Sequence, residues 1–335
     1  MASAPLLLLA DHSLPTFSNQ RNYFNNFDDK KTVYGNPKEI YQDLFVFKHL
    51  SKAKFPVYLV GSKVNKQYYA MKVFEYQNNQ PHPYFKNEVR FACFQHPYVI
   101  RNLYIENNKE IDSPKTDTRR ASYIIMEYAP YGDFFDLIKD HGSEIDSKLA
   151  RTYFRQLIDG LEYLHKNGVA HMDLKLENLL VGKDYALKIA DFDFSHFEND
   201  SEVISRGTKF YRAPEILNGK CKNTKAADIY SAGIVLFTFI TKGILPHSEN
   251  NIIKGTNLSE LLHYDTSKFW IIHSEIMENK TSIFDKDFKE LFIAMTRPQP
   301  EDRISIEDIK KSQWYNRPSY SFEEVKAIVG KILNN

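Results

Sequence analysis

The chain is poor in cysteine, carries almost no net charge and has no long hydrophobic run. Cys93 and Cys221 are its 2 cysteines among 335 residues, too few for a disulfide framework, which favours a reducing compartment. A formal net charge of +1 gives no electrostatic case for binding nucleic acid or an acidic membrane. No stretch approaches the ~20 apolar residues that a membrane-spanning helix needs. We therefore expect a cytoplasmic protein, with the nucleus as the intracellular alternative.

Several other features are also missing. The apolar residues 6–9 lack the length and the preceding basic segment of a secretory signal, so we expect none. The sequence shows no internal repeat and no Cys or His spacing typical of a metal site. What remains is a composition that is 42 % hydrophobic and 14 % aromatic, which is sufficient for a substantial core. The length suits one two-lobed enzyme or two small domains.

Two short polar runs in the second half of the chain combine the groups that phosphoryl transfer needs. Residues 171–178 read H-M-D-L-K-L-E-N, and residues 188–193 read K-I-A-D-F-D. Transfer from a nucleotide needs a carboxylate to orient the hydroxyl, a cation near the migrating phosphoryl, and oxygen ligands for Mg²⁺. The candidates for these tasks are Asp173, Lys175, Asn178 and Asp191. Each of them, taken singly, could instead be a loop residue that forms a local hydrogen bond.

The first run resembles the catalytic loop H-R-D-L-x-x-x-N of protein kinases, with Met172 in place of arginine. The second resembles D-F-G, with Asp193 in place of the glycine. Residues 207–215 match the family's G-T-x-x-Y-x-A-P-E segment, and residues 227–234 resemble D-x-W-S-x-G, which begins a buried helix. The resemblance covers roughly residues 41–315. It is to eukaryotic-type Ser/Thr kinases of the calcium/calmodulin-dependent or AMP-activated kinase type, because Lys175 follows Asp173 by two residues and Thr208 lies in the substrate-side segment.

This resemblance implies ATP and Mg²⁺ as cofactors and protein substrates as partners. Asp173 would orient the substrate hydroxyl, and Lys175 would neutralise the γ-phosphoryl group. Asn178 and Asp191 would ligate Mg²⁺. His171 is expected to brace the loop rather than to act as a base. The family's scaffold roles fall on Asp228 and on an ion pair between Glu215 and Arg303.

Lys72 lies in the alternating apolar segment Y-A-M-K-V, which predicts a β-strand. Burying a lysine there costs free energy unless it is paired. The resemblance implies that Lys72 binds the α- and β-phosphates and pairs with a helix glutamate, for which Glu88 is the best candidate. The alternative is that Glu88 lies on the surface of its helix.

The remaining nucleotide contacts follow from the resemblance alone. Glu127 and Ala129 would offer backbone groups to adenine, and Met126 would lie at the back of the adenine pocket or simply in the core. Asp133 would bind the ribose or a basic substrate residue. The turn over the phosphates would include Ser51, Phe55 and Val57.

The pattern of apolar residues predicts an α+β fold with two lobes. It is strand-like from about residue 43 to residue 128 and helical afterwards, with Tyr153, Leu157, Leu161 and Leu164 on one helix face and Gly168 at that helix's end. Residues 110–120 read as a charged loop between two strands. The expected division is a poorly ordered extension over 1–40, an N-lobe over 41–128, a C-lobe over 129–316 and a helical tail over 317–335.

Three departures from the family pattern leave the function open. Ser51, Ala53 and Pro56 stand where the phosphate-binding turn usually has glycines, which predicts weak ATP binding. Asp193 would add a carboxylate near the metals and stiffen the hinge, although aspartate tolerates the left-handed backbone of the usual glycine better than most residues. Met172 cannot pair with a phosphorylated activation loop. The first hypothesis is an active Ser/Thr kinase. The alternatives are a pseudokinase that acts as a binding module and, less favoured, a small-molecule kinase.

Overall fold

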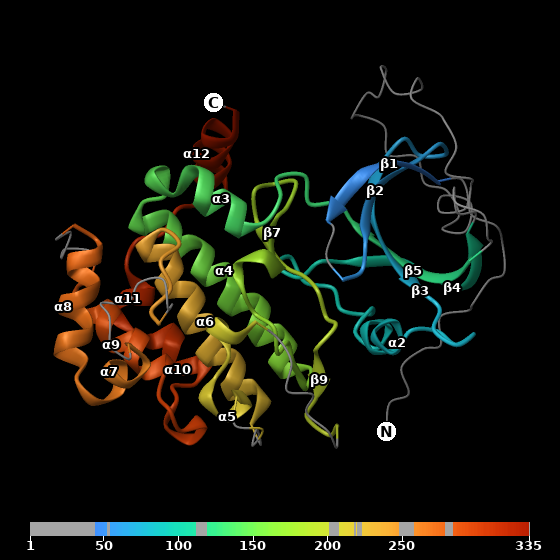
Figure 1. The fold of residues 1–335 in the computed structure, drawn as a ribbon. Helices are drawn as coiled ribbons and strands as arrows, with labels where there is room; N and C mark the ends of the chain where they lie inside the picture. The colour runs from blue at the N-terminus through green and yellow to red at the C-terminus, as the bar shows by residue number, and fades with distance from the viewer. Residues whose placement is uncertain are drawn as a thin grey trace. The chain divides into compact units, whose positions relative to one another are not determined.

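The computed structural model describes residues 44–51, 54–111, 119–200, 208–217, 219, 223–247, 258–278 and 284–334. The chain divides into two compact units (Figure 1). The small unit comprises residues 1–95 and 100–129, and the large unit comprises residues 96–99 and 130–335.

The small unit is built on one antiparallel sheet of five strands in the order β1-β2-β3-β5-β4. A short helix, α2, follows β3 in the chain. The elements are β1 (Leu44–Ser51), β2 (Val57–Ser62), β3 (Tyr68–Glu75), α2 (Pro83–Val89), β4 (Asn102–Ile111) and β5 (Arg119–Glu127). The strand-rich first part of the chain is therefore confirmed.

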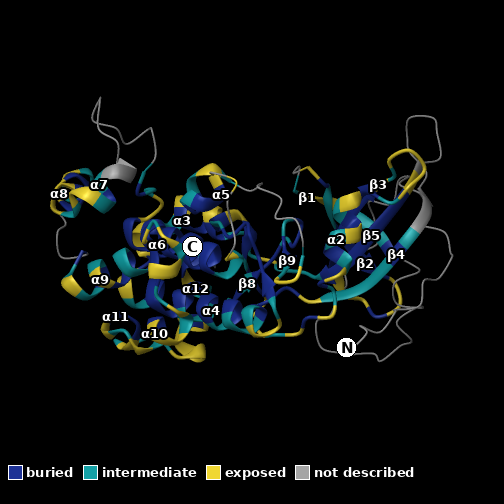
Figure 2. Cartoon of the chain, turned by 90° about the horizontal axis from the view of Figure 1, so that it is seen from below, coloured by how far each residue is buried: buried dark blue, intermediate teal, exposed yellow. Residues whose placement is uncertain are grey.

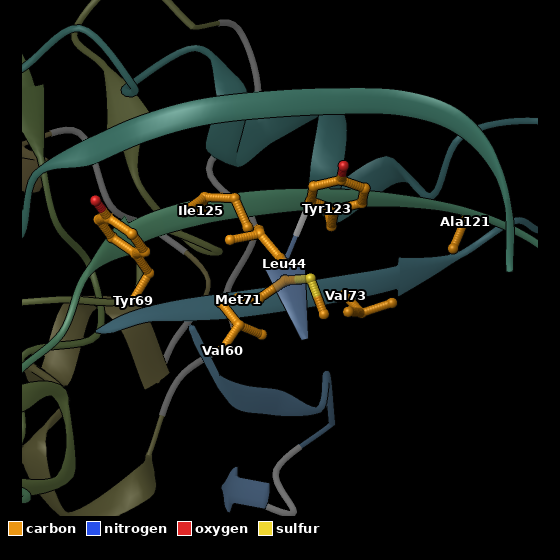
Figure 3. Close-up of a cluster of buried hydrophobic side chains, with 8 residues drawn as sticks. All are labelled: Leu44, Val60, Tyr69, Met71, Val73, Ala121, Tyr123 and Ile125. Carbon is orange, nitrogen blue, oxygen red and sulfur yellow. The ribbon is translucent and has the colours of Figure 1, made fainter. Parts of the chain in front are cut away.

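One face of this sheet carries a hydrophobic core (Figure 3). Its members are Leu44, Val60, Tyr69, Met71, Val73, Ala121, Tyr123 and Ile125. Because side chains alternate between the two faces of a strand, Lys72 and Phe74 lie on the opposite face of β3 from Met71 and Val73. This alternation separates the core of the sheet from the face that carries the predicted phosphate-binding lysine.

The charged loop predicted over residues 110–120 is wrong at both ends. Strand β4 continues to Ile111 and β5 begins at Arg119, with Glu110 paired to Arg120 in the ladder. The ladder consists of backbone hydrogen bonds, which charged side chains do not prevent. Apolar alternation therefore underestimated the strand lengths. The middle of the expected loop, residues 112–118, lies outside the described residues.

The large unit is mainly helical, with two small antiparallel strand pairs, β6 with β9 and β7 with β8. Figure 2 shows that α4 and α6 are its most buried helices. The helices are α3 (Phe134–His141), α4 (Ser147–Lys166), α5 (Pro214–Leu217), α6 (Thr224–Thr241), α7 (Leu258–Tyr264), α8 (Thr266–Ile276), α9 (Lys286–Met295), α10 (Ile306–Lys311), α11 (Gln313–Asn316) and α12 (Phe322–Asn334). The strands are β6 (Val169–Ala170), β7 (Leu179–Val181), β8 (Leu187–Ile189) and β9 (His196–Phe197).

Helix α4 begins and ends where its sequence predicts. Asp146 caps its N-terminus by accepting a hydrogen bond of 2.7 Å from the backbone N–H of Leu149. The helix ends at Lys166, and Gly168 follows with a φ of +74°, a conformation that glycine adopts without steric cost. Its apolar face buries Leu157, Leu161 and other residues of the predicted stripe. This helix leads directly into β6 and the polar runs.

The C-terminal segment is anchored to α4 by arginine side chains. Arg155 donates to the backbone carbonyl oxygens of Tyr315 and Arg317 and to Ser319 Oγ. Arg151 donates to the carbonyl oxygen of Pro318 at 2.8 Å. These bonds hold the start of the segment that leads to α12. Within the part of the chain that the structure describes, every helix is too short or too polar to cross a lipid bilayer.

Candidate active site

The carboxylate of Asp228 holds the loop between β6 and β7 through hydrogen bonds. This carboxylate is fully buried in α6, and it accepts hydrogen bonds of 2.8 Å from the backbone N–H groups of His171 and Met172. His165 Nε2 lies 2.9 Å from the same carboxylate. A buried carboxylate requires such partners, and here they are backbone groups of the loop. The prediction that Asp228 serves the scaffold is confirmed.

The loop needs this support because Met172 has a φ of +68°. The left-handed conformation costs a non-glycine residue roughly 1–2 kcal/mol. Its N–H bond to Asp228 and the burial of its side chain, which is 7 % exposed, hold it there. The arginine usual at this place in the resembling family would be a cation, whereas Met172 is an apolar residue packed into the interior.

His171 links the two polar runs. Its Nε2 donates to the carbonyl oxygen of Ala190 at 3.0 Å, and its own carbonyl oxygen accepts a bond from Ser195 Oγ at 3.1 Å. The ring is fully buried. These contacts support the expectation that His171 braces the loop.

The three predicted catalytic residues lie together. Asn178 Nδ2 donates to the backbone oxygen of Asp173 at 2.8 Å and to its carboxylate at 2.9 Å. Lys175 Nζ lies 2.9 Å from the same carboxylate oxygen, Oδ2. Both Asp173 and Asn178 are 6 % exposed. The carboxylate is therefore fixed in orientation by its neighbours rather than free to rotate in solvent.

Thr208 completes this arrangement. Its backbone N–H donates to Asp173 Oδ1 at 3.0 Å, and its hydroxyl accepts a bond of 2.9 Å from Lys175 Nζ. The sequence indicated Thr208 only as a marker of the substrate-side segment. Its direct contact with the two catalytic candidates was not predicted, although the G-T pair of the matched segment was the available signal. We refer to Asp173, Lys175, Asn178 and Thr208 as the catalytic cluster.

The second polar run contains two neighbouring carboxylates. One oxygen of Asp191 and one of Asp193 lie within 4.8 Å of each other, a spacing at which a cation could bind both. The residue with left-handed backbone is Asp191, whose φ is +68°, and Asp193 lies outside that region. The expected left-handed turn at residue 193 is therefore wrong. The left-handed residue of this turn is Asp191, two residues before Asp193. Asp193 can therefore stand in place of the usual glycine without backbone strain of its own.

In the small unit, Lys72 and Glu88 form the ion pair that the resemblance implied. Lys72 Nζ lies 2.7 Å from Glu88 Oε2, and the side chains are 8 % and 4 % exposed. Glu88 points inward from α2, which excludes the surface alternative. The pair joins β3 to α2.

The other predicted nucleotide contacts are spread over both units. Ser51 pairs with Val57 across β1 and β2, where the ladder register is irregular. The ring of Phe55 is packed inside the small unit and is 7 % exposed. Glu127 uses its carboxylate to accept a bond of 2.8 Å from the N–H of Arg101. Ala129 is partly exposed at the last residue of the small unit, and Ala53 lies outside the described residues.

Asp133 caps α3 in the large unit. Its Oδ1 accepts a bond of 2.9 Å from the N–H of Asp136. Burial raises the pKa of Asp133, and the nearby carboxylates of Asp136 and Glu177 raise it further, against the lowering effect of that hydrogen bond. Three carboxylates therefore gather at the start of α3.

Comparison with known proteins adds independent findings. Residues 55–315 match the protein kinase domain. Among curated proteins, the chain is 37 % identical over 224 residues to CBL-interacting serine/threonine-protein kinase 8 of Arabidopsis thaliana. The aligned region covers 66 % of this chain and 44 % of that relative. It is 34 % identical over 233 residues to serine/threonine protein kinase OSK3 of Oryza sativa subsp. indica. This alignment covers 69 % of this chain and 41 % of that relative.

A third relative, the probable serine/threonine-protein kinase KCC4 of Saccharomyces cerevisiae, is 37 % identical over 195 residues, 58 % of this chain and 18 % of the relative. The chain thus spans less than half the length of these curated relatives. The matched domain covers most of the chain. The chain therefore belongs to the protein kinase family, among relatives that are serine/threonine kinases.

Proposed function

We propose that the chain transfers the γ-phosphoryl group of Mg·ATP to serine or threonine hydroxyls of proteins. The catalytic cluster carries this proposal. Its carboxylate, ammonium and amide groups are hydrogen-bonded to one another within 3.0 Å, so no large rearrangement is needed to bring them together. Positioning and charge stabilisation are nearly all that a protein supplies in phosphoryl transfer.

In this proposal Asp173 orients the substrate hydroxyl and accepts its proton. The N–H of Thr208 holds one carboxylate oxygen, and Asn178 and Lys175 hold the other. Lys175 Nζ also places a positive charge between Asp173 and Thr208, where negative charge would develop on the transferred group. The same ammonium thereby serves both the carboxylate and the phosphoryl group.

The donor set also suits the expected cofactors. Asn178 and Asp191 offer the oxygen ligands that Mg²⁺ prefers, and Asp193 brings a further carboxylate close to Asp191. Lys72, paired with Glu88, would bind the α- and β-phosphates. When bound, Mg²⁺ neutralises phosphate charge and aligns the group to be transferred.

The first test compares carboxylate variants of the large unit. Asp173→Asn should abolish transfer from labelled ATP to a serine peptide while leaving Mg·ATP binding almost intact. Asp191→Ala should abolish transfer and also weaken Mg·ATP binding. Asp184→Asn, an exposed carboxylate in the turn between β7 and β8, is the matched control and should change neither. Undiminished transfer by Asp173→Asn would refute the assignment.

The pseudokinase alternative rests on the missing glycines of the β1–β2 turn and on Asp193 in place of the usual glycine. It is distinguished by measuring Mg·ATP-dependent thermal stabilisation and then transfer to peptide on the same preparation. Stabilisation without transfer would favour the binding module. For the active enzyme we expect a KM for ATP in the upper part of the usual range of ~1 μM to 1 mM.

The three carboxylates at the start of α3 favour a substrate with a basic residue before the phosphoacceptor. An arginine there would form charge-assisted bonds to Asp133 or Glu177. Asp133→Asn removes the charge but keeps the helix cap, because asparagine caps as well as aspartate. Together with Glu177→Gln, it should erase a preference for arginine two or three residues before Ser or Thr on a peptide array. A proline-directed or acidic preference of the unmodified protein would contradict this proposal.

We place this activity inside the cell, in the cytoplasm or the nucleus, where ATP is available to a kinase. The exposed free thiol of Cys93 agrees with a reducing environment. Localisation of a tagged full-length chain would test this part of the proposal.

A further inference from the structure

The turn that precedes β2 packs into the small unit. The ring of Phe55 is 7 % exposed and is surrounded by other rings. Its centroid lies 4.7 Å from that of Phe74, 4.9 Å from that of His82 and 5.5 Å from that of Tyr84. Lys54 Nζ lies 3.6 Å from the centroid of the Tyr84 ring, which is a close cation–π contact.

These partners belong to two different elements. Phe74 lies on β3, on the same face as Lys72. His82 caps α2 by accepting a bond from the N–H of Tyr84, which lies in the first turn of that helix. The backbone fixes the turn as well, because Pro56 accepts a bond of 3.0 Å from the N–H of Val73. Phe55 therefore fills the junction between β3 and the start of α2.

Helix α2 needs such a contact because it has only 7 residues. An isolated helix of that length is not stable in water, so its place must come from tertiary packing. Tyr84 and Phe85 precede Glu88 by four and three residues, which puts all three on one side of the helix. The packing of these rings thus sets the direction in which Glu88 points.

The same cluster reaches the ion pair. Lys72 Nζ lies 5.8 Å from the centroid of the Phe55 ring and 5.3 Å from that of Phe74, while its bond to Glu88 is 2.7 Å long. The ring centroid of Phe85, which is 4 % exposed, lies 5.6 Å from that of Phe74. The ammonium thus lies beside the rings of Phe55 and Phe74 and the carboxylate of Glu88.

We propose that Phe55 is a positioning residue that holds α2 against β3 and so keeps Glu88 within reach of Lys72. The turn of residues 54–56 would then support the ion pair through an aromatic ring. A glycine-rich loop, by contrast, would bind the phosphates directly. The inference deepens the proposed function, since the ion pair matters for catalysis only if the chain binds Mg·ATP. The contacts that carry it lie entirely within the small unit.

The first experiment needs no enzymatic activity. Phe55→Ala should speed hydrogen exchange of the α2 backbone by about tenfold, because the helix loses its main contact with the turn. Phe55→Leu should restore much of the protection. Phe47→Ala is the matched control, since Phe47 lies on β1 and its ring packs against Phe45 and Tyr68. Unchanged exchange of α2 in Phe55→Ala would overturn the proposal.

The second experiment asks whether the ring acts through the ion pair. Phe55→Ala should weaken binding of Mg·ADP by about fivefold, and it should have no further effect in a Glu88→Gln background. Additive effects would show that Phe55 contacts nucleotide independently of Glu88 and would overturn the proposal. Tighter binding by Phe55→Ala would do the same, because the ring would then obstruct the phosphates. If the unmodified protein binds no Mg·ADP, the proposed function fails while the exchange experiment still decides the role of Phe55.

Discussion

Among the described residues, each unit contains a lysine– or arginine–carboxylate pair that is deeply buried, Lys72–Glu88 and Arg303–Glu215, and the two pairs are built differently. In the large unit, Arg303 binds both carboxylate oxygens of Glu215, at 2.5 and 2.6 Å. It also donates to the carbonyl oxygens of Arg297, Ala226 and Pro298. In the small unit, Lys72 Nζ lies 2.7 Å from one oxygen of Glu88, and the rings of Phe55 and Phe74 lie beside it.

This difference indicates that the Arg303–Glu215 pair is structural, whereas Lys72 can exchange its carboxylate partner for a ligand. The guanidinium of Arg303 is planar, permanently charged and bonded in several directions, so it cannot leave Glu215 without stranding several acceptors. The ammonium of Lys72 is a compact charge on a flexible stem, and it can turn from a carboxylate to a phosphate oxygen. Both pairs lie on residues of the matched domain, but their surroundings suit only the second one to ligand binding.

Breaking the pair in the large unit should have the largest effect on stability. Arg303→Ala leaves the buried carboxylate of Glu215 without a cation, which costs about 3–5 kcal/mol. The expected result is a strong fall in the midpoint of urea unfolding. Arg317→Ala is the control, because Arg317 pairs with Asp285 and Asp287 at the surface and should lose at most ~1 kcal/mol. Equal losses in the two variants would show that burial of the Arg303 pair is unimportant.

Exchanging the two cations sharpens the comparison. Arg303→Lys keeps the charge but leaves backbone carbonyls without donors, and should cost about 1–3 kcal/mol with little change in the activity of the folded enzyme. Lys72→Arg should instead lower activity and leave stability nearly unchanged. A rigid guanidinium can keep the ion pair with Glu88, but it fits the phosphates poorly. We expect nearly unchanged stability and at least about tenfold lower transfer, ~1.4 kcal/mol in the barrier. Full activity of Lys72→Arg would contradict the division of roles.

The sequence predicted which polar residues of the large unit lie together better than it predicted the packing of the small unit. Asp173, Lys175 and Asn178 are close in the chain and read as one motif, and the structure brings them together. The inward packing of Phe55 depends on rings from β3 and α2, which are distant in sequence. No local pattern indicates such a contact, so the sequence predicted for Phe55 only a place over the phosphates.

The sequence also predicted the backbone conformation of the second polar run poorly. The left-handed residue was expected at Asp193 because the family has glycine there, but the structure places it at Asp191. Local propensity disfavours αL for both residues to a similar degree. Which residue of the turn adopts it depends on how the turn joins its neighbours, such as the bond from the Ala190 N–H to the Asn178 oxygen. Conformations imposed by tertiary contacts are not encoded in residue type alone.

Acid should affect the large unit through buried histidines. Burial lowers the pKa of His247, His263 and His273 below the ordinary value of 6.5. As the pH falls below 6.5, the unfolded chain therefore binds protons that the folded chain does not, and stability decreases until the folded-state pKa values are passed. Around these rings, His247 and His273 donate to the carbonyls of Phe210 and Phe269, and Arg297 and Arg303 lie near His263.

The measurement is urea unfolding at about pH 7.5 and about pH 5.5, where only histidine among the unperturbed side chains changes charge. His247→Gln and His273→Asn preserve the donor to each carbonyl and should reduce the difference in stability between the two pH values. The exposed His49, changed to Gln, is the control and should leave that difference unchanged. A difference that is equally large in all variants would assign the acid sensitivity to other groups.

The smallest effect is expected from the activation loop. Phosphorylation orders such a loop when the new phosphate meets an arginine, and Met172, 7 % exposed and apolar, cannot supply one. Ser201 and Ser205, which lie outside the described residues, should therefore matter little. Phosphatase-treated enzyme, the Ser201→Ala/Ser205→Ala variant and wild type should differ by less than about tenfold on one peptide, ~1.4 kcal/mol in the barrier. A larger loss would direct attention to Arg212, whose buried Nε has no hydrogen-bond partner among the described residues and could receive a phosphate in place of the missing arginine.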